Sequence, residues 1–364
     1  MNRDRIGVAL LAPLPPPTGG IGTWALRVKE AMPKECEITF VNEGLVGGRE
    51  FFGEKSKKKL SDEWKRCQRI WRDLESVLST GEIDIVHANI PAVPGGILRE
   101  LRCAQIAHAH NCKFIVHWHS TVSQSVNSRV TEALLKRICD VADAIIVLNE
   151  KSRSYVEART NTPVYLLPNF VSDGELTFRV SARKKIETCL YVGGVCEDKG
   201  IYEFLELAER FPGITFKAIG KIEGGVTDAA PKNVVLTGPL DHSDIKDAMV
   251  DADIFIFLTH YRHEGFSVAL TEAMAAGLPC IATDWAANKD MIGQSGGIII
   301  QCGNVDSACE ALRHLESPDV RAFMGRTNVD RVANSYTARV VLNDLCGIYS
   351  DVMTRNSARR CDFR

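Results

Sequence analysis

Short runs of apolar, often β-branched residues recur along this chain, and each run is followed by a segment with helical periodicity. The first series is IGVALLAPL (6–14), IDIVHAN (83–89), KFIVHWHS (113–120), DAIIVLN (143–149) and VYLLPN (164–169). The second is TCLYVGG (188–194), TFKAIG (215–220), NVVLTG (233–238), DIFIFLT (253–259), PCIATD (279–284) and GGIIIQC (296–302). Apolar strands that alternate with helices are typical of a parallel sheet covered on both faces. The sequence therefore predicts an α/β protein with two Rossmann-like, doubly wound domains.

The stretch between the two series, residues 169–185, is polar and has no helical period. The chain of 364 residues is long enough for two domains of ordinary size. We therefore predict an N-terminal domain at 1–170 and a C-terminal domain at 171–349. Ligands of open α/β sheets bind outside the carboxyl ends of the strands, so the expected site is the cleft between the two domains.

The composition excludes several classes of protein. Hydrophobic residues make up 45% of the chain, charged residues 25%, and the net charge is −2, which gives no general attraction to nucleic acid. The N-terminal apolar run is broken by prolines and lacks a signal-peptide pattern, and no segment is long enough to span a membrane. The 12 cysteines form no C-x-x-C pair, which favours reduced thiols in a cytoplasmic protein.

A glycine-rich stretch, PPPTGGIGTW, follows the first predicted strand and leads into a helix. Gly19, Gly20 and Gly22 would let the backbone approach a ligand, and the helix start would offer free N–H groups to an anion. The stretch is neither the dinucleotide-binding pattern nor a P-loop. A plain turn remains an equally good interpretation.

The third strand of the first series ends in HWHS. Alternation along the strand directs His117 and His119 to one face of the sheet and Trp118 to the other. His108 and His110 repeat this spacing, but no carboxylate or cysteine accompanies either pair at ligand spacing, so we predict no metal site. We expect His117 to be packed in the core, and His119, at the end of the strand, to face the cleft.

The second series opens with a strand, a glycine turn that contains Gly194, and Lys199 at the start of an amphipathic helix. A lysine opposes the positive end of the helix dipole. Its ammonium group therefore either extends into solvent or is held by an anionic ligand. The position after the first strand of the domain, which matches that of the glycine loop at 19–22, favours the anion.

The stretch HEGFSVALTEAMAAGLPCIATD (263–284) predicts a helix that begins near Ser267, a good N-cap, and ends at Gly277 and Pro279. Glu264 precedes this helix and would lie beside the free N–H groups at 266–268, which could hold a phosphate. Glu272 lies just over one turn into the helix. Its carboxylate could accept hydrogen bonds from a ribose diol, although a solvated helix face is the alternative interpretation.

Four of these stretches, GGIG, LLPN, VGGVCEDKG and HEGFSVALTEAMAAGLPCIATD, resemble in content and order the family 4 retaining glycosyltransferases of the GT-B fold. The resemblance spans nearly the whole chain, and the E-x7-E block is its most specific part. It implies two domains that face a central cleft, with a nucleotide-sugar donor such as a UDP- or GDP-sugar on the C-terminal domain. It also implies an acceptor on the N-terminal domain, no cofactor and no divalent metal, and a C-terminal helix, about 350–364, that packs back on the first domain.

The resemblance assigns roles to matching positions. The glycine loop and the lysine would contact the donor diphosphate, the first glutamate would bind sugar hydroxyls, the second would bind the ribose, and the backbone at 237–240 would meet the base. The predicted catalytic residues are His119, Lys199 and Glu264. The predicted donor-binding residues are Gly19, Gly20, Gly22, Gly194, Lys199, Leu240, Glu264, Gly265, Phe266, Ser267, Val268 and Glu272.

This chain departs from the family pattern at a few positions. The family often has an arginine where Gly194 stands, and Arg262 is a candidate substitute. Asn169 matches the family's P-N-G motif, but Phe170 replaces the glycine, and Asp290 stands where a glutamate is common.

The expected activity is transfer of a hexose or N-acetylhexosamine to a glycan or lipid-linked acceptor in surface polysaccharide or glycoconjugate synthesis. A front-face retaining mechanism is implied, with the leaving phosphate as base. The alternatives are a nucleotide-sugar 2-epimerase, which needs no acceptor, and a non-catalytic protein that binds nucleotide-sugars.

Residues 54–74, EKSKKKLSDEWKRCQRIWRDL, form an amphipathic pattern. Apolar residues fall on one helical stripe, and basic residues surround it: Leu60, Trp64, Cys67, Trp71 and Leu74, with Lys57, Lys58, Lys59, Lys65, Arg66, Arg69 and Arg72. Such a helix could lie on the anionic inner face of the cell membrane near a lipid-linked acceptor. A solvated helix that packs its tryptophans into the domain is the alternative.

Overall fold

The computed structural model of the chain describes residues 5–14, 20–44, 60–90, 93–176 and 183–355. The chain forms two compact units, one of Met1–Pro168 with Ala338–Arg364 and the other of Asn169–Thr337. The first boundary lies close to the predicted one. The second differs from the prediction, because everything from Ala338 onwards belongs to the first unit. The C-terminal segment that belongs to the first unit is therefore the whole last helix and not only residues 350–364.

The first unit contains a six-stranded parallel sheet with the strand order β2-β1-β3-β4-β5-β6. Its strands are β1 (Ile6–Ala12), β2 (Cys36–Asn42), β3 (Ile85–Ile90), β4 (Lys113–Trp118), β5 (Ala144–Val147) and β6 (Val164–Leu166). The edge strand β2 is missing from the predicted series. Its sequence, CEITFVN, mixes polar with apolar residues, and only Cys36 and Val41 are buried, so no continuous apolar run marks it.

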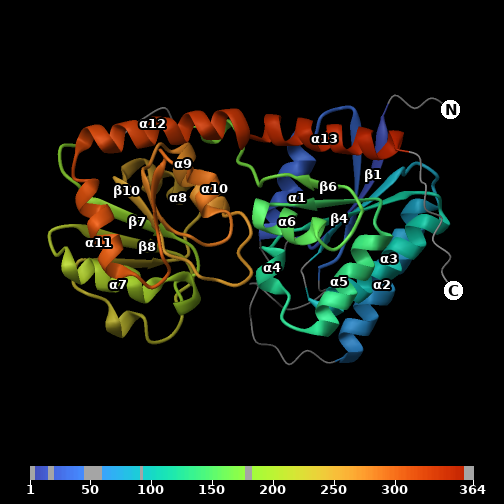
Figure 1. Ribbon diagram of the computed structural model, residues 1–364, viewed down its shortest axis with the longest axis horizontal. Coiled ribbons are helices and arrows are strands. Elements are labelled where there is room, and N and C mark those ends of the chain that lie inside the picture. The colour runs from blue at the N-terminus through green and yellow to red at the C-terminus, as the bar shows by residue number, and fades with distance from the viewer. Residues whose placement is uncertain (1–4, 15–19, 45–59, 91–92, 177–182, 356–364) are drawn as a thin grey trace. The chain divides into compact units, whose positions relative to one another are not determined.

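Helices cover both faces of this sheet (Figure 1). On one face lie α2 (Leu60–Leu78), α3 (Pro94–Ala109) and α5 (Arg129–Val141), and α1 (Gly20–Ala31) and α13 (Ala338–Thr354) pack together. The short helices α4 (Val122–Ser125) and α6 (Glu150–Glu157) contact each other near β6. The apolar side of α13, which includes Val341, Leu345 and Val352, is fully buried, and this explains why the helix belongs to the first unit.

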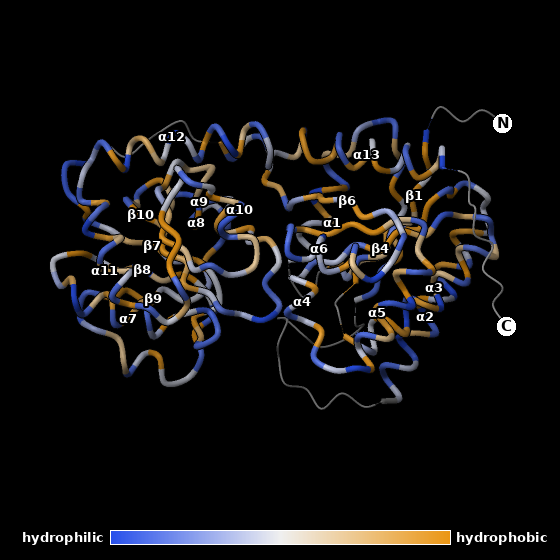
Figure 2. The backbone as a smooth tube through the Cα atoms, viewed as in Figure 1, coloured by the Kyte–Doolittle hydropathy of each residue, from blue (hydrophilic) through white to orange (hydrophobic). Residues whose placement is uncertain are grey.

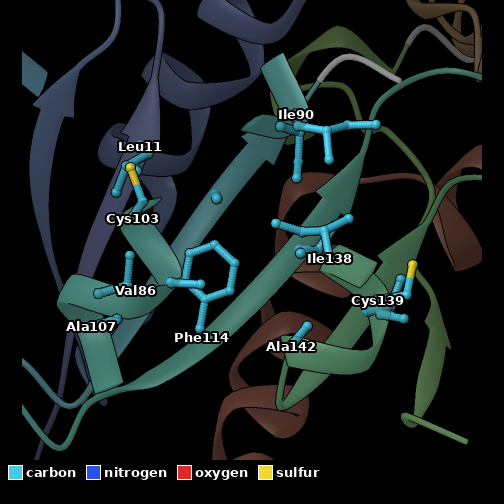
Figure 3. Close-up of a cluster of buried hydrophobic side chains, with 14 of the residues drawn as sticks. Leu11, Val86, Ile90, Cys103, Ala107, Phe114, Ile138, Cys139 and Ala142 are labelled. Carbon is cyan, nitrogen blue, oxygen red and sulfur yellow. The ribbon is translucent and has the colours of Figure 1, made fainter. Parts of the chain in front are cut away.

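A hydrophobic core fills the space between the sheet and the α3 and α5 layer. Figure 3 shows Phe114 of β4 surrounded by side chains from neighbouring strands and from α3, among them Val86, Cys103 and Ala107. All four are fully buried. Since successive side chains of a strand point to opposite faces, the residues next to these core positions, such as His87, face the other side of the sheet.

The second unit has a six-stranded parallel sheet with the order β12-β11-β10-β7-β8-β9. The strands are β7 (Thr188–Val192), β8 (Thr215–Ile219), β9 (Val234–Gly238), β10 (Ile254–Phe257), β11 (Cys280–Thr283) and β12 (Gly297–Ile300). Each lies within a run that the sequence predicts as a strand. Figure 2 shows strands of both sheets as hydrophobic stretches inside a more hydrophilic periphery.

The helices of the second unit are α7 (Ile201–Arg210), α8 (His242–Asp251), α9 (Val268–Ala275), α10 (Asn288–Ile292), α11 (Val305–His314) and α12 (Pro318–Ser335). α9 contacts α8, α10 and α12, while α7 contacts α11. The predicted ends of α9 are confirmed. Ser267 caps the start, and Gly277, at φ +76°, closes the end with hydrogen bonds from Gly277 N to Met274 O and from Leu278 N to Ala273 O.

Candidate active site

The strand order of the second unit marks where a ligand would bind. The chain builds the sheet from β7 outwards through β8 and β9, and then returns to place β10 on the other side of β7. Ligands of doubly wound sheets bind at such a switch point, outside the carboxyl ends of the strands. The loops after β7 and β10 hold Lys199 and Glu264, two of the three predicted catalytic residues.

Lys199 and Glu264 form a direct ion pair at this switch point. The Nζ atom of Lys199 lies 2.5 Å from Oε2 of Glu264 and 4.5 Å from the centre of the Tyr261 ring. Both side chains are mostly buried, with 21% and 13% of their surface exposed. Trp285 donates a hydrogen bond from Nε1 to the Tyr261 carbonyl oxygen and so helps to hold the loop after β10. The ammonium group is therefore fixed in position before any ligand arrives.

A glycine allows the lysine loop to approach β10 closely. Gly200 follows the short 3₁₀ turn η2 (Glu197–Lys199) and has φ +77°, and a Cβ atom there would lie 2.2 Å from the carbonyl oxygen of Leu258. The backbone N–H of His260 donates to the Asp198 carbonyl oxygen across the same contact, at 3.0 Å. A larger residue at position 200 would push Lys199 away from the switch point.

The first turn of α9 follows Glu264 closely in the sequence and presents backbone N–H donors. Ser267 accepts a hydrogen bond from Leu270 N through its side chain, while the N–H groups of Val268 and Ala269 have no earlier helical carbonyl to bind. Asn169 donates from Nδ2 to the Phe266 carbonyl oxygen at 2.8 Å. The Phe266 side chain is buried against Tyr336, so this residue contributes its backbone and not its ring to the loop surface.

Glu272 lies on α9 among other polar groups that the sequence analysis did not link to it. One ligand atom each of Glu175, His242 and Glu272 lies within 4.8 Å of the others, and His242 Nε2 is 3.5 Å from Glu175 Oε1. The alternative interpretation of Glu272, a solvated helix face, describes it incompletely, because the residue is half-buried beside this pair. These three side chains could accept hydrogen bonds from the hydroxyls of a ribose. Their carboxylate and imidazole atoms are also ligands that suit a small divalent cation.

The remaining predicted residues of the second unit lie after the strands of its sheet or at the helices that follow them. Gly194 is exposed, and its carbonyl oxygen accepts a hydrogen bond from Tyr191 Oη at 2.7 Å. A Cβ atom at Gly194 would meet only Cys196 Sγ, at 3.7 Å, so the backbone here does not require a glycine for steric reasons. Leu240 is half-buried just after β9, and Gly265 is buried. Arg262 and Asp290 are exposed, Asp290 on α10.

In the first unit, His119 follows β4 and contacts β3. Its Nε2 atom lies 2.6 Å from Oδ1 of Asn89, while Asn89 Nδ2 donates to the Leu11 carbonyl oxygen at 2.9 Å. A carbonyl oxygen can only accept, so it fixes the orientation of the Asn89 amide. Asn89 Oδ1 must then accept a hydrogen bond from His119. The ring hydrogen therefore lies on Nε2, and Nδ1 is the ring's acceptor atom.

His119 belongs to an aromatic cluster that confirms the predicted alternation. The ring centroids of His117 and His119 are 4.1 Å apart, and His117 Nδ1 lies 3.1 Å from His87 Nε2. Trp24 of α1 packs edge-on against both His117 and His119. Trp118 lies in the core on the opposite face. Burial lowers the pKa of His87 and of His119 to about 3, and lowers that of His117 well below its usual value. All three rings are therefore neutral at pH 7.

The glycine loop is described only in part, because Gly19 lies outside the described residues. Gly20 is the first residue of α1 and is exposed, and a Cβ atom there would meet nothing within 4 Å. Gly22 is buried in the first turn of the same helix. The sequence predicts both glycines in the loop before the helix, whereas the structure places them within the first turn of α1. The other histidine pair binds no common partner: His108 pairs with Asp143 and His110 with Glu75.

Several residues of the candidate site were not singled out from the sequence. Asn89 is a polar residue next to the carboxyl end of β3, and a polar residue at that end of a mostly apolar strand was the available signal. Tyr261 lies in the loop after β10, Glu175 at the end of the 3₁₀ turn η1 (Asp173–Glu175) and His242 at the start of α8, where side-chain periodicity gives no information on direction.

Helix α2 only partly matches either interpretation of residues 54–74. Its buried side consists of Ile70, Leu74 and Leu78, and Trp71 packs against the core and donates a hydrogen bond to the Arg99 carbonyl oxygen. Trp64 is 58% exposed, however. Two of the basic residues are engaged by the protein, since Arg66 donates to Glu43 O and Arg69 to Asn42 O and Gly44 O. Lys57, Lys58 and Lys59 lie outside the described residues. No helix in the described ranges could cross a membrane.

Comparison with known proteins agrees with this geometry. Residues 18–175 match the family model described as Glycosyltransferase Family 4, and residues 186–317 match the one described as Glycosyl transferases group 1. The chain is 28% identical to processive diacylglycerol alpha-glucosyltransferase of Acholeplasma laidlawii, over 55% of this chain and 66% of that protein. It is 22% identical to phosphatidyl-myo-inositol mannosyltransferase of Mycolicibacterium smegmatis, over 77% of this chain and 74% of that protein.

Two solved structures share the fold. Sucrose-phosphate synthase from Thermosynechococcus elongatus has a TM-score of 0.75 with 16% identity, covering 96% of this chain and 99% of that one. Anabaena HepE in complex with UDP has a TM-score of 0.73 with 12% identity, covering 95% of this chain and 100% of that one. With both halves of the chain matched by family models and both sheets built as the fold requires, the chain belongs to the family 4 glycosyltransferases of the GT-B fold.

Proposed function

We propose that this chain is a retaining, metal-independent glycosyltransferase that moves a hexose or N-acetylhexosamine from a nucleotide-sugar to a lipid-linked or glycan acceptor. One observation carries the proposal most directly. The ion pair of Lys199 and Glu264 lies at the switch point of the second sheet, next in the chain to the open first turn of α9. A cation and backbone donors at such a point suit a diphosphate, and the carboxylate suits sugar hydroxyls.

In this proposal the second unit binds the donor. The Lys199 ammonium group and the N–H groups of Val268 and Ala269 bind the diphosphate, and Glu264 accepts hydrogen bonds from the sugar. Glu272 accepts hydrogen bonds from the ribose hydroxyls, and the backbone near Leu240 contacts the base. HepE, whose fold this chain shares, was solved with UDP-glucose, which makes UDP-sugars the first donors to test.

The chemical step separates charge. The bond between the anomeric carbon and the diphosphate oxygen breaks, its electron pair stays on the diphosphate, and an oxocarbenium-like sugar remains. The acceptor hydroxyl attacks the same face, and its proton passes to the leaving phosphate oxygen. Stabilising the developing charge with one well-placed donor contributes about 3–4 kcal/mol, so the fixed position of Lys199 is the main contribution of this chain to the rate.

The first unit is assigned to the acceptor side of the reaction, with His119 near the transferred sugar. His119 is neutral, and its free Nδ1 can accept a hydrogen bond from a sugar hydroxyl. The names of two relatives contain lipids, diacylglycerol and phosphatidyl-myo-inositol. A lipid acceptor is therefore the first one to test for this chain.

The test is product analysis with labelled UDP-, GDP- and ADP-sugars and vesicles that contain diacylglycerol or phosphatidylinositol, in EDTA. The proposal predicts a labelled lipid with the same anomeric configuration as the donor. An inverted product would disprove retention, and a strict need for magnesium would disprove metal independence. Conversion of the donor sugar without any acceptor would instead favour the 2-epimerase alternative. Donor binding without turnover under every condition would favour a non-catalytic binding protein.

A further inference from the structure

Two cysteine sulfurs meet where the last helix packs on the first unit. Cys36 is the first residue of β2 and Cys346 lies near the middle of α13, and their Sγ atoms are 3.2 Å apart. A disulfide bond has an S–S distance of about 2.05 Å, so roughly 1 Å of approach would join them. Both cysteines are free in this structure.

The two thiols are not equivalent. Cys36 is buried, with 7% of its surface exposed, whereas Cys346 is half-buried. The Cys36 thiol donates its hydrogen bond to the Cys346 sulfur, and this bond is the main cause that lowers the pKa of Cys346 and raises that of Cys36. The thiolate is the reactive form of cysteine. Cys346 is therefore suited to attack a reagent from solvent, and the buried Cys36 is suited to attack the Cys346 sulfur afterwards.

The thiol pair also borders the histidine cluster. Tyr349 follows Cys346 by one helical turn and lies on the same buried side of α13. Its Oη atom is 2.7 Å from His87 Nδ1, and His87 contacts His117 in turn. A covalent bond at Cys346 would hold this turn of α13, and with it Tyr349, against β2 and β3.

We propose that Cys36 and Cys346 form a redox-active dithiol site whose substrate is a small disulfide of the glutathione class, and that its oxidation ties α13 covalently to β2. The Cys346 thiolate attacks one sulfur of the small disulfide and forms a mixed disulfide, and the first small thiol leaves. Cys36 then loses its proton and attacks the Cys346 sulfur, so that the second small thiol leaves. Two electrons pass from the protein thiols to the small disulfide, and the two thiol protons end on the released thiols.

The bond would act on the segment that connects the two units. Residues 337 and 338 form one of the two chain connections between them, and α13 begins immediately after it. Oxidation would prevent α13 from detaching from the first unit, because it closes a chain loop between residues 310 positions apart. This inference does not depend on the transferase activity.

The experiment uses the full chain, reduced and desalted under nitrogen and then incubated with glutathione disulfide. We expect Cys36 and Cys346 to lose their thiols and to appear as a cross-linked peptide in the protease digest, with a glutathione adduct on the exposed Cys302. Dithiothreitol should reverse both changes. The Cys36→Ser variant should accumulate a glutathione adduct on Cys346, since nothing resolves it. The Cys346→Ser variant should leave Cys36 unmodified. Cys302→Ser, which removes an exposed cysteine elsewhere, should cross-link like the unmodified chain.

A thermal unfolding series provides the second readout. Oxidation should raise the Tm by about 5 °C or more in the unmodified chain and in Cys302→Ser, and should not change it in either serine variant of the pair. Absence of the cross-link at a glutathione disulfide concentration that fully modifies Cys302 would overturn the proposal. Equal modification of Cys36 and Cys346 in the two serine variants would overturn the assigned roles.

Discussion

The Nζ atom of Lys199 and the Oε2 atom of Glu264 lie 2.5 Å apart, although 65 residues separate them in the sequence. The pair joins the loop after β7 to the loop after β10, the two strands that meet at the switch point of the second sheet. Each partner holds the other in place. A diphosphate would therefore meet a cation that needs no reorganisation, and this is the condition under which electrostatic stabilisation is most effective.

Replacing Glu264 should separate binding from turnover. We expect Glu264→Gln to lower kcat by about 100-fold or more, because the sugar loses its charged acceptor and Lys199 loses its anchor. The dissociation constant for the nucleoside diphosphate should change by less than about threefold, since the diphosphate binds the lysine and the α9 backbone. Steady-state kinetics and calorimetry measure the two quantities. An equal loss in both would mean that Glu264 serves donor binding alone.

Replacing Asn89 should act through His119. In Asn89→Ala the imidazole loses the partner that keeps its proton on Nε2, and ¹⁵N NMR of the ring should show a mixture of tautomers. In Asn89→Asp a carboxylate faces the ring and should raise the pKa of His119 from its present value of about 3. The ring would then become charged below the raised pKa, and the transfer rate should fall as the pH drops through that value. A pH–rate profile identical to that of the unmodified chain would contradict this role of Asn89.

Trp64 should determine any contact with an anionic membrane. It is 58% exposed on α2, whereas Trp71 is packed into the first unit. If α2 lies on the membrane, Trp64→Ala should weaken co-sedimentation with anionic vesicles about threefold or more, and raised salt should weaken it further. Phe323→Ala removes an equally exposed aromatic residue from α12 of the second unit, 55% exposed, and should have no effect. Equal effects of both substitutions would argue against a specific contact of α2.

The histidine cluster should make the fold sensitive to mild acid. His87 and His119 have a folded pKa of about 3 against an ordinary value of 6.5. The unfolded chain therefore takes up protons below pH 6.5 that the folded chain does not. The free energy of unfolding should fall as the pH drops from 6.5 towards 3, by up to roughly 1.4 kcal/mol per pH unit for each such histidine.

Urea unfolding at pH 7.0, 6.0 and 5.0 measures this slope. His87→Phe should lower the pH dependence of the free energy of unfolding by the equivalent of up to one proton taken up on unfolding. His314→Asn, at an exposed position, should leave this slope unchanged. An unchanged slope in His87→Phe would mean that this ring is protonated in the fold.

The sequence predicts the second sheet well because all six of its strands are apolar runs bounded by turns. It misses β2, an edge strand whose Glu37 is exposed and breaks the apolar pattern. The boundary at Ala338 could not be read from the chain, since the apolar stripe of α13 has helical spacing whichever unit it packs on. The motif residues Lys199 and Glu264 were found because strand ends and helix starts mark them. Asn89 was missed because its role depends on two partners far from it in the sequence, Leu11 of β1 and His119 after β4.

Calorimetric titration of the full chain with UDP, GDP and ADP in EDTA tests the central claim most directly. The account predicts that at least one nucleoside diphosphate binds without metal, and that Lys199→Met weakens this binding about tenfold or more. Lys289→Met, which removes an exposed lysine from α10, should bind like the unmodified chain. If none of the three nucleotides binds, or if Lys199→Met binds as tightly as the Lys289 variant, the switch point of the second sheet is not the donor site.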